Sequence, residues 1–192
     1  MPRVKLILSV VALTLGLASY YALANYSAYH SAATTLMGNA KAVQANWQKL
    51  TSRLHLDPAV TEPGALAPVL ARKHSALDWL VYGEHVMNDP YKEEFQKLGI
   101  EPLMKNMHVT APDGQLHYGV AGARLNSMTV LADGTTAVFY SETHRPVIEA
   151  LLALYDPKPF KTIGDNTGIV RYGQVGEHEY AVGLYLPPAA NP

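Results

Sequence analysis

Two histidines on either side of a predicted turn are the residues of this chain best suited to bind a metal ion. His108 and His117 flank Asp113-Gly114, a dipeptide typical of two-residue β-hairpin turns. In such a hairpin residue 117 pairs with residue 110, and the two histidines become diagonal neighbours about 7–8 Å apart on one face.

Methionines next to this predicted hairpin suggest which metal it would take. Met104 and Met107 lie close to the histidines in the sequence, and thioether and imidazole ligands together suit copper. Two histidines and two flexible thioethers do not complete a coordination sphere. The alternative is a solvent-facing strand surface that carries two polar histidines, His108 and His117.

A second group of polar residues surrounds the next predicted hairpin and the start of the helix after it. Its members are Tyr118, Arg124, Tyr140 and His144, followed directly by Arg145. A guanidinium beside a phenol can hold a carboxylate through charge-assisted hydrogen bonds, which makes this group a candidate ligand-binding site. The alternative is that both arginines lie on the surface and Tyr140 belongs to the core.

The sequence motifs of common enzymes are absent from this chain. It contains neither H-E-x-x-H nor G-x-S-x-G nor a phosphate-binding loop, and it has no cysteine. Glu84-His85 and Glu177-His178-Glu179 lack a partner at metal-ligand spacing, so solvated charges are the simpler interpretation. We therefore expect a non-enzymatic protein without a cofactor.

The elements that position these residues begin with a long helix marked by a heptad pattern. Apolar or aromatic residues recur at alternating steps of four and three, the spacing of a helix that keeps one face against a partner. They are Ala22, Tyr26, Tyr29, Ala33, Leu36, Ala40, Val43, Trp47, Leu50 and Leu54. Either a second chain or the protein's own domain would cover this seam. We expect the interface to comprise Leu36, Val43, Trp47, Leu50 and Leu54.

The same predicted helix starts as a membrane-type segment. Arg3 and Lys5 precede an apolar run over 6–24, long enough to span a bilayer. Tyr20, Tyr21, Tyr26 and Tyr29 would supply an interfacial aromatic belt. A cleaved signal peptide ending at Ala22-Leu23-Ala24 is the alternative, but the unbroken seam favours an anchor over 1–25.

Three parts follow from this pattern: the anchor, a stalk helix over 26–56 that ends before Asp57-Pro58, and an extracytoplasmic domain over 57–192. This arrangement predicts a single-pass protein of a bacterial inner membrane with its C-terminal domain in the periplasm.

The domain has a mixed pattern. Helical spacing predicts helices over 66–81, 91–98 and 146–155, the last with Val147, Leu151 and Leu154 inward. Alternation predicts strands around 115–120 and a final pair over 167–174 and 178–186, and Asp133-Gly134 suits a type I′ hairpin turn. The fold class is therefore α+β, an antiparallel sheet packed with helices.

Two segments resemble the extracytoplasmic Cache domains, which are PAS-like sensor modules. Residues 107–118 are similar to the Cache hairpin around D-x-D-G, with Ala111-Pro112 before the Asp-Gly, and 160–186 resembles the closing strand pair. The resemblance implies a sensor for small molecules. Cache receptors usually continue through a second membrane helix, whereas this chain stops at Pro192, so a sensor of this kind would act through a partner.

The composition of the chain limits the classes of partner that we expect it to bind. Fifteen basic and 16 acidic residues give a net charge of −1, without a basic run, which argues against nucleic acid. We expect a membrane-anchored, non-enzymatic subunit that assembles with other membrane proteins through its stalk and domain. The alternatives are a Cache-like carboxylate sensor or binding module acting through a partner and, third, a periplasmic copper-binding protein.

Overall fold

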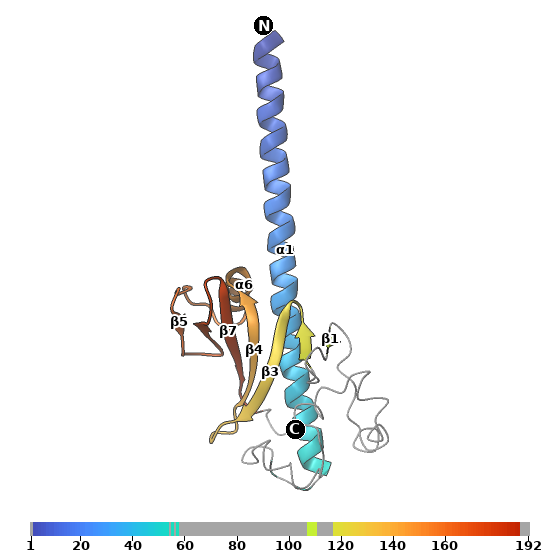
Figure 1. Cartoon of the computed structure of the whole chain (residues 1–192), viewed down its shortest axis with the longest axis vertical. Helices are drawn as coiled ribbons and strands as arrows, with labels where there is room; N and C mark the ends of the chain where they lie inside the picture. The colour runs from blue at the N-terminus through green and yellow to red at the C-terminus, as the bar shows by residue number, and fades with distance from the viewer. Residues whose placement is uncertain (1, 54, 56, 58–106, 111–116, 189–192) are drawn as a thin grey trace.

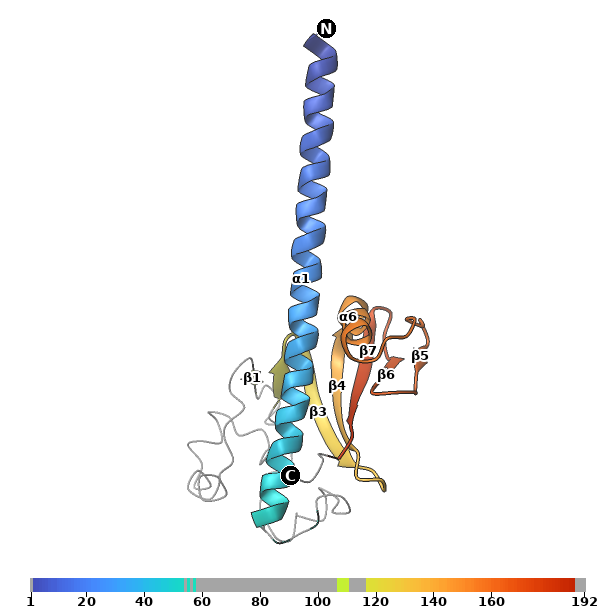
Figure 2. The same ribbon diagram turned by 180° about the vertical axis from the view of Figure 1, so that it is seen from behind.

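The described residues form one long helix, a short helix and an antiparallel sheet, and the sheet packs on the lower half of the long helix (Figures 1 and 2). The computed structural model describes residues 2–53, 55, 57, 107–110 and 117–188, without the side chains of 2–17, 53, 107–110 and 117. Helix α1 spans Pro2–Arg53, which corresponds to about 78 Å at 1.5 Å per residue. The predictions for 66–81 and 91–98 lie outside the described residues.

Seven strands form one antiparallel sheet, in the order β1-β2-β3-β4-β7-β6-β5. The strands are β1 Met107–Thr110, β2 His117–Val120, β3 Ala123–Val130, β4 Thr136–His144, β5 Gly164–Asp165, β6 Val170–Gln174 and β7 Glu179–Leu186. Helix α6, Arg145–Tyr155, connects β4 to the second half of the sheet. Both helices share one core with the sheet, so the α+β class is confirmed.

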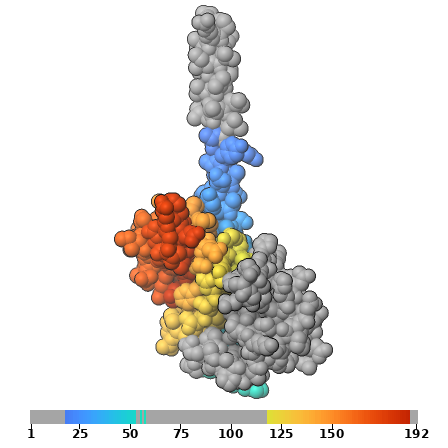
Figure 3. Space-filling model, in the orientation of Figure 1, coloured from blue at the N-terminus to red at the C-terminus, as the bar shows by residue number. Residues whose placement is uncertain are grey.

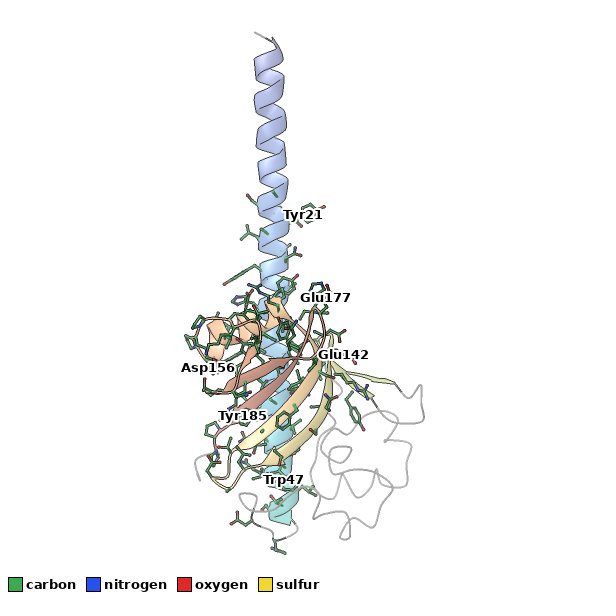
Figure 4. All side chains as sticks on the ribbon, turned by 60° about the vertical axis from the view of Figure 1, so that its left-hand side comes forward. Tyr21, Trp47, Glu142, Asp156, Glu177 and Tyr185 are labelled. Carbon is green, nitrogen blue, oxygen red and sulfur yellow. The ribbon has the colours of Figure 1, made fainter. Side chains whose placement is uncertain are left out.

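The heptad seam of α1 is divided between the domain and solvent. Its lower residues, Ala33, Leu36, Ala40, Val43, Trp47 and Leu50, are at most 1% exposed and lie in the core. In Figure 4 Trp47 lies where the lower part of α1 crosses the sheet, whereas Tyr21 projects from the helix above the domain. Of the two partners left open for the seam, the protein's own sheet therefore covers the lower part.

Polar contacts fix the position of α1 on the sheet. The hydroxyl of Tyr140 in β4 donates to Oδ1 of Asn39 at 2.8 Å. Nε2 of Gln44 donates to the carbonyl of Pro187 at 2.8 Å, just beyond the end of β7. These contacts connect the helix to both central strands.

The lower end of α1 comes earlier than the sequence predicts. The helix ends at Arg53 because His55 adopts a left-handed φ of 55°, and its N–H donates to the carbonyl of Ser52 at 3.1 Å. The stalk prediction extended the helix to 56, whereas His55 is already outside it. Leu54 lies outside the described residues.

Helix α6 is predicted to within one residue at its start, but one of its inward residues is wrong. Val147 and Leu151 are buried, whereas Leu154 is 42% exposed. Burial also includes Ile148, Ala150 and Leu152. The buried stripe therefore ends at Leu152, and the two residues after it are exposed.

Two β-bulges change which residues of β3 and β4 face the helices. In β3 the pairing shifts between Leu125 and Ser127, which leaves Asn126 as the extra residue. In β4 it shifts between Tyr140 and Thr143, where Glu142 takes a φ of 58°. Each bulge inverts the inward-outward alternation beyond it, and this shows in the burial pattern of both strands.

One turn of the sheet was not predicted, and one predicted turn is wrong. The β2–β3 connection is a two-residue turn, Ala121-Gly122, with both φ angles positive as type I′ requires. At Asp133-Gly134 the type I′ prediction is wrong: Gly134 donates to the carbonyl of Leu131 at 2.8 Å, and only Gly134 has a positive φ. The observed loop is therefore longer than two residues.

The first hairpin and the last strands agree with the sequence. Thr110 pairs with His117, the register that Asp113-Gly114 predicts. Strands β6 and β7 fall within the predicted final pair, and the alternating residues of β7 are buried as expected: Tyr180, Val182, Leu184 and Leu186. Strand β5, only two residues long, was not predicted.

Within the part of the chain that the structure describes, no helix combines the length and the hydropathy of a membrane span.

Trp47 provides a test of the shared core. Replacing Trp47 by Ala removes a side chain that is 1% exposed, and we expect the free energy of unfolding to fall by about 3–5 kcal/mol. Urea unfolding of the full-length protein in detergent measures this. Tyr21→Ala is the control, because Tyr21 is 64% exposed and should change stability by less than about 0.5 kcal/mol. Equal effects of the two variants would contradict the packing of α1 on the sheet.

Ala121 tests the type I′ turn. Its φ of 49° is unfavourable for a residue with a Cβ, so Ala121→Gly should raise the free energy of unfolding by about 0.5–1 kcal/mol. Ala153→Gly, at an exposed position of helix α6, should instead lower it by about 1 kcal/mol. A loss of stability in both variants would show that residue 121 does not adopt the left-handed conformation.

Candidate functional site: a groove between α1 and α6

The predicted carboxylate site does not come together. Tyr118, Leu125 and Tyr140 are cross-strand neighbours on the face that packs against the helices. Arg124 pairs with Gly119 on one side and Ser141 on the other, so its side chain lies on the opposite face. Arg124 and Tyr140 therefore cannot hold one ligand between them.

Tyr140 is a core residue, as the alternative interpretation held. Its side chain is 0% exposed, and burial raises the pKa of its phenol. The hydroxyl donates to Asn39 and also lies 3.3 Å from the carbonyl oxygen of Leu36. The phenol thus connects β4 to α1, and these contacts take the place of a contact with a ligand.

His144 lies apart from these residues, at the start of α6. It is exposed, has an extended backbone and makes no side-chain cap to the helix. Its Nδ1 lies 3.4 Å from the carbonyl oxygen of His178. This contact joins the loop before β7 to the end of β4.

The candidate metal ligands are placed only at the level of the backbone. His108 pairs with Gly119 and His117 with Thr110, which makes the histidines diagonal neighbours as predicted. Their side chains, Met104 and Glu84-His85 lie outside what the structure describes. Among the described residues no group of three or more His, Asp or Glu could hold a metal ion. The side chains of Glu177 and His178 are 91% and 86% exposed, and Nε2 of His178 lies 3.8 Å from Oε1 of Glu177.

One concave feature among the described residues is a groove between the upper part of α1 and helix α6. It has a volume of about 360 Å³. Its lining residues from α1 are Ala22, Asn25, Tyr26, Tyr29 and His30, and those from α6 are Pro146, Glu149, Ala150 and Ala153. In Figure 3 the blue segment of α1, which includes the lining residues of this helix, rises above the domain.

The wall continues the heptad seam. Tyr26 is 62% exposed and Tyr29 is 36% exposed, although both lie in register with the buried residues below. The Tyr26 and His30 rings lie 4.1 Å apart between centroids. The floor carries a carboxylate, Glu149, whose Oε1 accepts from Nε of Arg145 at 2.8 Å. The groove therefore offers aromatic faces and one negative charge.

The heptad seam predicted the side of the groove that α1 forms, but no sequence pattern predicted the side that α6 forms. Ala22 and Tyr26 belong to the heptad pattern, whereas Glu149 and Ala153 lie more than a hundred residues away in a helix expected only to pack inward. The groove exists because α6 packs on α1 just below His30. Only the tertiary structure brings the two together.

A second polar cluster fixes the loop between α6 and β6. Lys158 Nζ lies 3.2 Å from Asp156 Oδ2 and 3.5 Å from Asp165 Oδ1, and it also donates to the carbonyl of Thr167. Lys161 pairs with Asp165 Oδ2 at 2.9 Å. The ammonium of Lys158 thus occupies the centre of an oxygen-lined loop, where it is already paired.

The loop is also closely packed around the carboxylate of Asp156. Asp156 Oδ2 also accepts from the N–H of Val170 at 3.0 Å. Gly168 has a φ of 71°, and a Cβ there would meet that carboxylate at 2.1 Å. Tyr172 stacks on Phe160 with centroids 5.4 Å apart. We interpret this cluster as structural, since every carboxylate in it serves the loop (Asp156 is labelled in Figure 4).

Neither a protein-family model, nor a curated protein, nor a solved structure matches this chain.

Asp165 gives the loop a pH dependence that can be measured. The Thr167 hydroxyl, the Lys161 ammonium and the Thr167 amide hold the pKa of Asp165 well below 3.8, its ordinary value. A pKa that folding lowers contributes stability above the unfolded pKa, and that stability is lost as the pH falls through the folded pKa. Unfolding free energies from about pH 5 to about pH 2 should therefore fall more steeply in the wild type than in Asp165→Asn.

Glu177→Gln is the control for this measurement because its side chain is 91% exposed. It should keep the slope of the wild type. A wild-type slope in Asp165→Asn would mean that the carboxylate is not held in its charged form by the loop.

Proposed function

We propose that this protein is a membrane-anchored, extracytoplasmic subunit without enzymatic activity, which assembles with other membrane proteins. The proposal has an apolar N-terminal half of α1 in the membrane and the sheet domain in the periplasm of a bacterium. It is supported chiefly by the character of α1: one helix enters the core of the domain at its lower end and extends well beyond the domain at its upper end.

The exposed upper part of α1 is unusual for a helix in water. Tyr20, Tyr21, Leu23 and Tyr26 are each 62–69% exposed. Between Lys5 and Lys41 the helix carries no Asp, Glu, Lys or Arg. Contiguous exposed apolar surface of this kind marks a membrane or protein contact. Tyrosines just beyond an apolar run also fit the aromatic belt of an interface.

The continuity of α1 would hold the domain close to the membrane. The apolar run ends at Ala24 and the first buried seam residue is Ala33, nine residues later. At 1.5 Å per residue the separation is about 14 Å. The surface left for partners is then the upper helix, the groove beside α6, and the sheet face opposite the helices.

That opposite face has the composition of a protein contact. The guanidinium of Arg171 lies 3.8 Å from the centroid of Tyr185, and Phe139 meets the same ring edge-on at 6.0 Å. Arginine and aromatic side chains are the residues most enriched in interface hot spots. Tyr185 is labelled in Figure 4.

A binding module that acts through a partner is the second candidate function. The groove between α1 and α6 favours it, being a cavity of about 360 Å³. Its charged lining residue is Glu149, so this site would accept a cation instead of the carboxylate first expected. The Cache-type resemblance and a copper site at His108 and His117 also stay proposals, the former supported by the antiparallel sheet only at the level of fold class.

The anchor has a direct test. If 6–24 stays in the membrane, the intact mass of the protein extracted from membranes corresponds to a chain that keeps this segment. A soluble mature chain that begins at Asn25 would show that the segment is a cleaved signal peptide and would refute the anchor. The measurement needs only membrane extraction and mass spectrometry.

A further inference from the structure

The charge of the groove between α1 and α6 selects the kind of group that it can bind. Glu149 is the one Asp, Glu, Lys or Arg among its lining residues. Tyr26 and Tyr29 also line the groove, and the face of a phenol ring attracts cations through its negative quadrupole. A carboxylate next to aromatic rings is a site for an ammonium group.

The opposite charge lies beside the groove, on Arg145, which is not one of its lining residues. Arg145 lies one helical turn before Glu149, with Nε 2.8 Å from Oε1, and its guanidinium lies 4.7 Å from the centroid of Phe160. The two side chains are 60% and 43% exposed, so their ion pair is weak and can rearrange around a ligand. A positive and a negative group side by side are complementary to a zwitterion.

The position of the groove identifies the source of such a zwitterion. Its α1 wall runs over 22–30, beginning where the apolar run of 6–24 ends. Nine residues of helix span about 12 Å, and the polar interfacial layer of one leaflet is roughly 5–8 Å thick, so the wall begins within that layer and extends past it. In the anchored arrangement the groove would therefore lie at the level of lipid headgroups.

We propose that this groove binds the headgroup of a phospholipid that carries a primary ammonium, as phosphatidylethanolamine does. The ammonium lies against Glu149 and the rings of Tyr26 and Tyr29, and the phosphate faces Arg145. This inference rests on the proposed anchoring of α1. Its consequence is that the domain is held against the bilayer at a second point, beside the helix itself.

The test uses the full-length protein in nanodiscs with equal amounts of phosphatidylethanolamine and phosphatidylglycerol. Native mass spectrometry then reports which lipid stays bound when the protein is released. We expect the wild type to retain the ethanolamine lipid about threefold or more over the glycerol lipid. Glu149→Gln and Tyr26→Leu should lose most of this preference, whereas Glu177→Gln, the matched control, should keep it.

Two further measurements test whether a soluble compound or a protein, instead of a lipid, occupies the groove. Soluble phosphoethanolamine, which has no acyl chains, should not displace the retained lipid; displacement would assign the groove to a soluble compound and overturn the lipid assignment. A photo-crosslinking side chain at Ala153 should capture lipid. Capture of a protein at that position would replace the lipid by a partner chain.

Failure of this inference can be separated from failure of the anchor. A protein that enters nanodiscs and retains both lipids equally, in the wild type as in Glu149→Gln, overturns the headgroup site and leaves the anchor intact. A protein that does not enter nanodiscs at all overturns both.

Discussion

The packing of the lower half of α1 across the sheet is the contact on which the rest of the structure depends. Leu36, Val43, Trp47 and Leu50 place one stripe of the helix in the same core as β4 and β7. A stalk helix is usually a spacer beside a domain, whereas this one is part of the domain's interior. The domain therefore cannot tilt or rotate on the helix without breaking its own core, and any force on the N-terminal half of α1 reaches the sheet directly.

The same contact explains why the candidate carboxylate site failed. Tyr140 lies on the helix-facing side of β4, where its hydroxyl donates to Asn39 of α1, and Arg124 faces the other way because of the bulge at Asn126. Without that bulge the register that starts at Val130 and Thr136 would place Arg124 opposite Glu142, on the face of Tyr140. One extra residue in β3 thus separated two side chains that the sequence had suggested as neighbours.

Local patterns predicted the elements well and their combination poorly. Alternation in Tyr180 to Leu186, the helix that starts near Pro146, and the pairing of residue 117 with 110 all follow from periodicity or turn chemistry within a few residues. The bulges, the two-residue strand β5 and the loop at Gly134 depend on pairing across the sheet. A left-handed Glu142 has no sequence signal, since glutamate is not a residue that favours that conformation. The groove beside α6 was equally inaccessible, because its two walls come from opposite ends of the chain.

We propose that one continuous helix serves both the membrane and the core of the domain. Because the chain contains no cysteine, single cysteines placed along α1 can be labelled in intact spheroplasts with a membrane-impermeant maleimide. The account predicts labelling at Ser31 and Ser52, which are exposed, protection at Ala40, which is buried in the core, and protection at Ser9 in the apolar run. Labelling at Ala40 equal to that at Ser31 would contradict the shared core, and labelling at Ser9 would contradict the anchor.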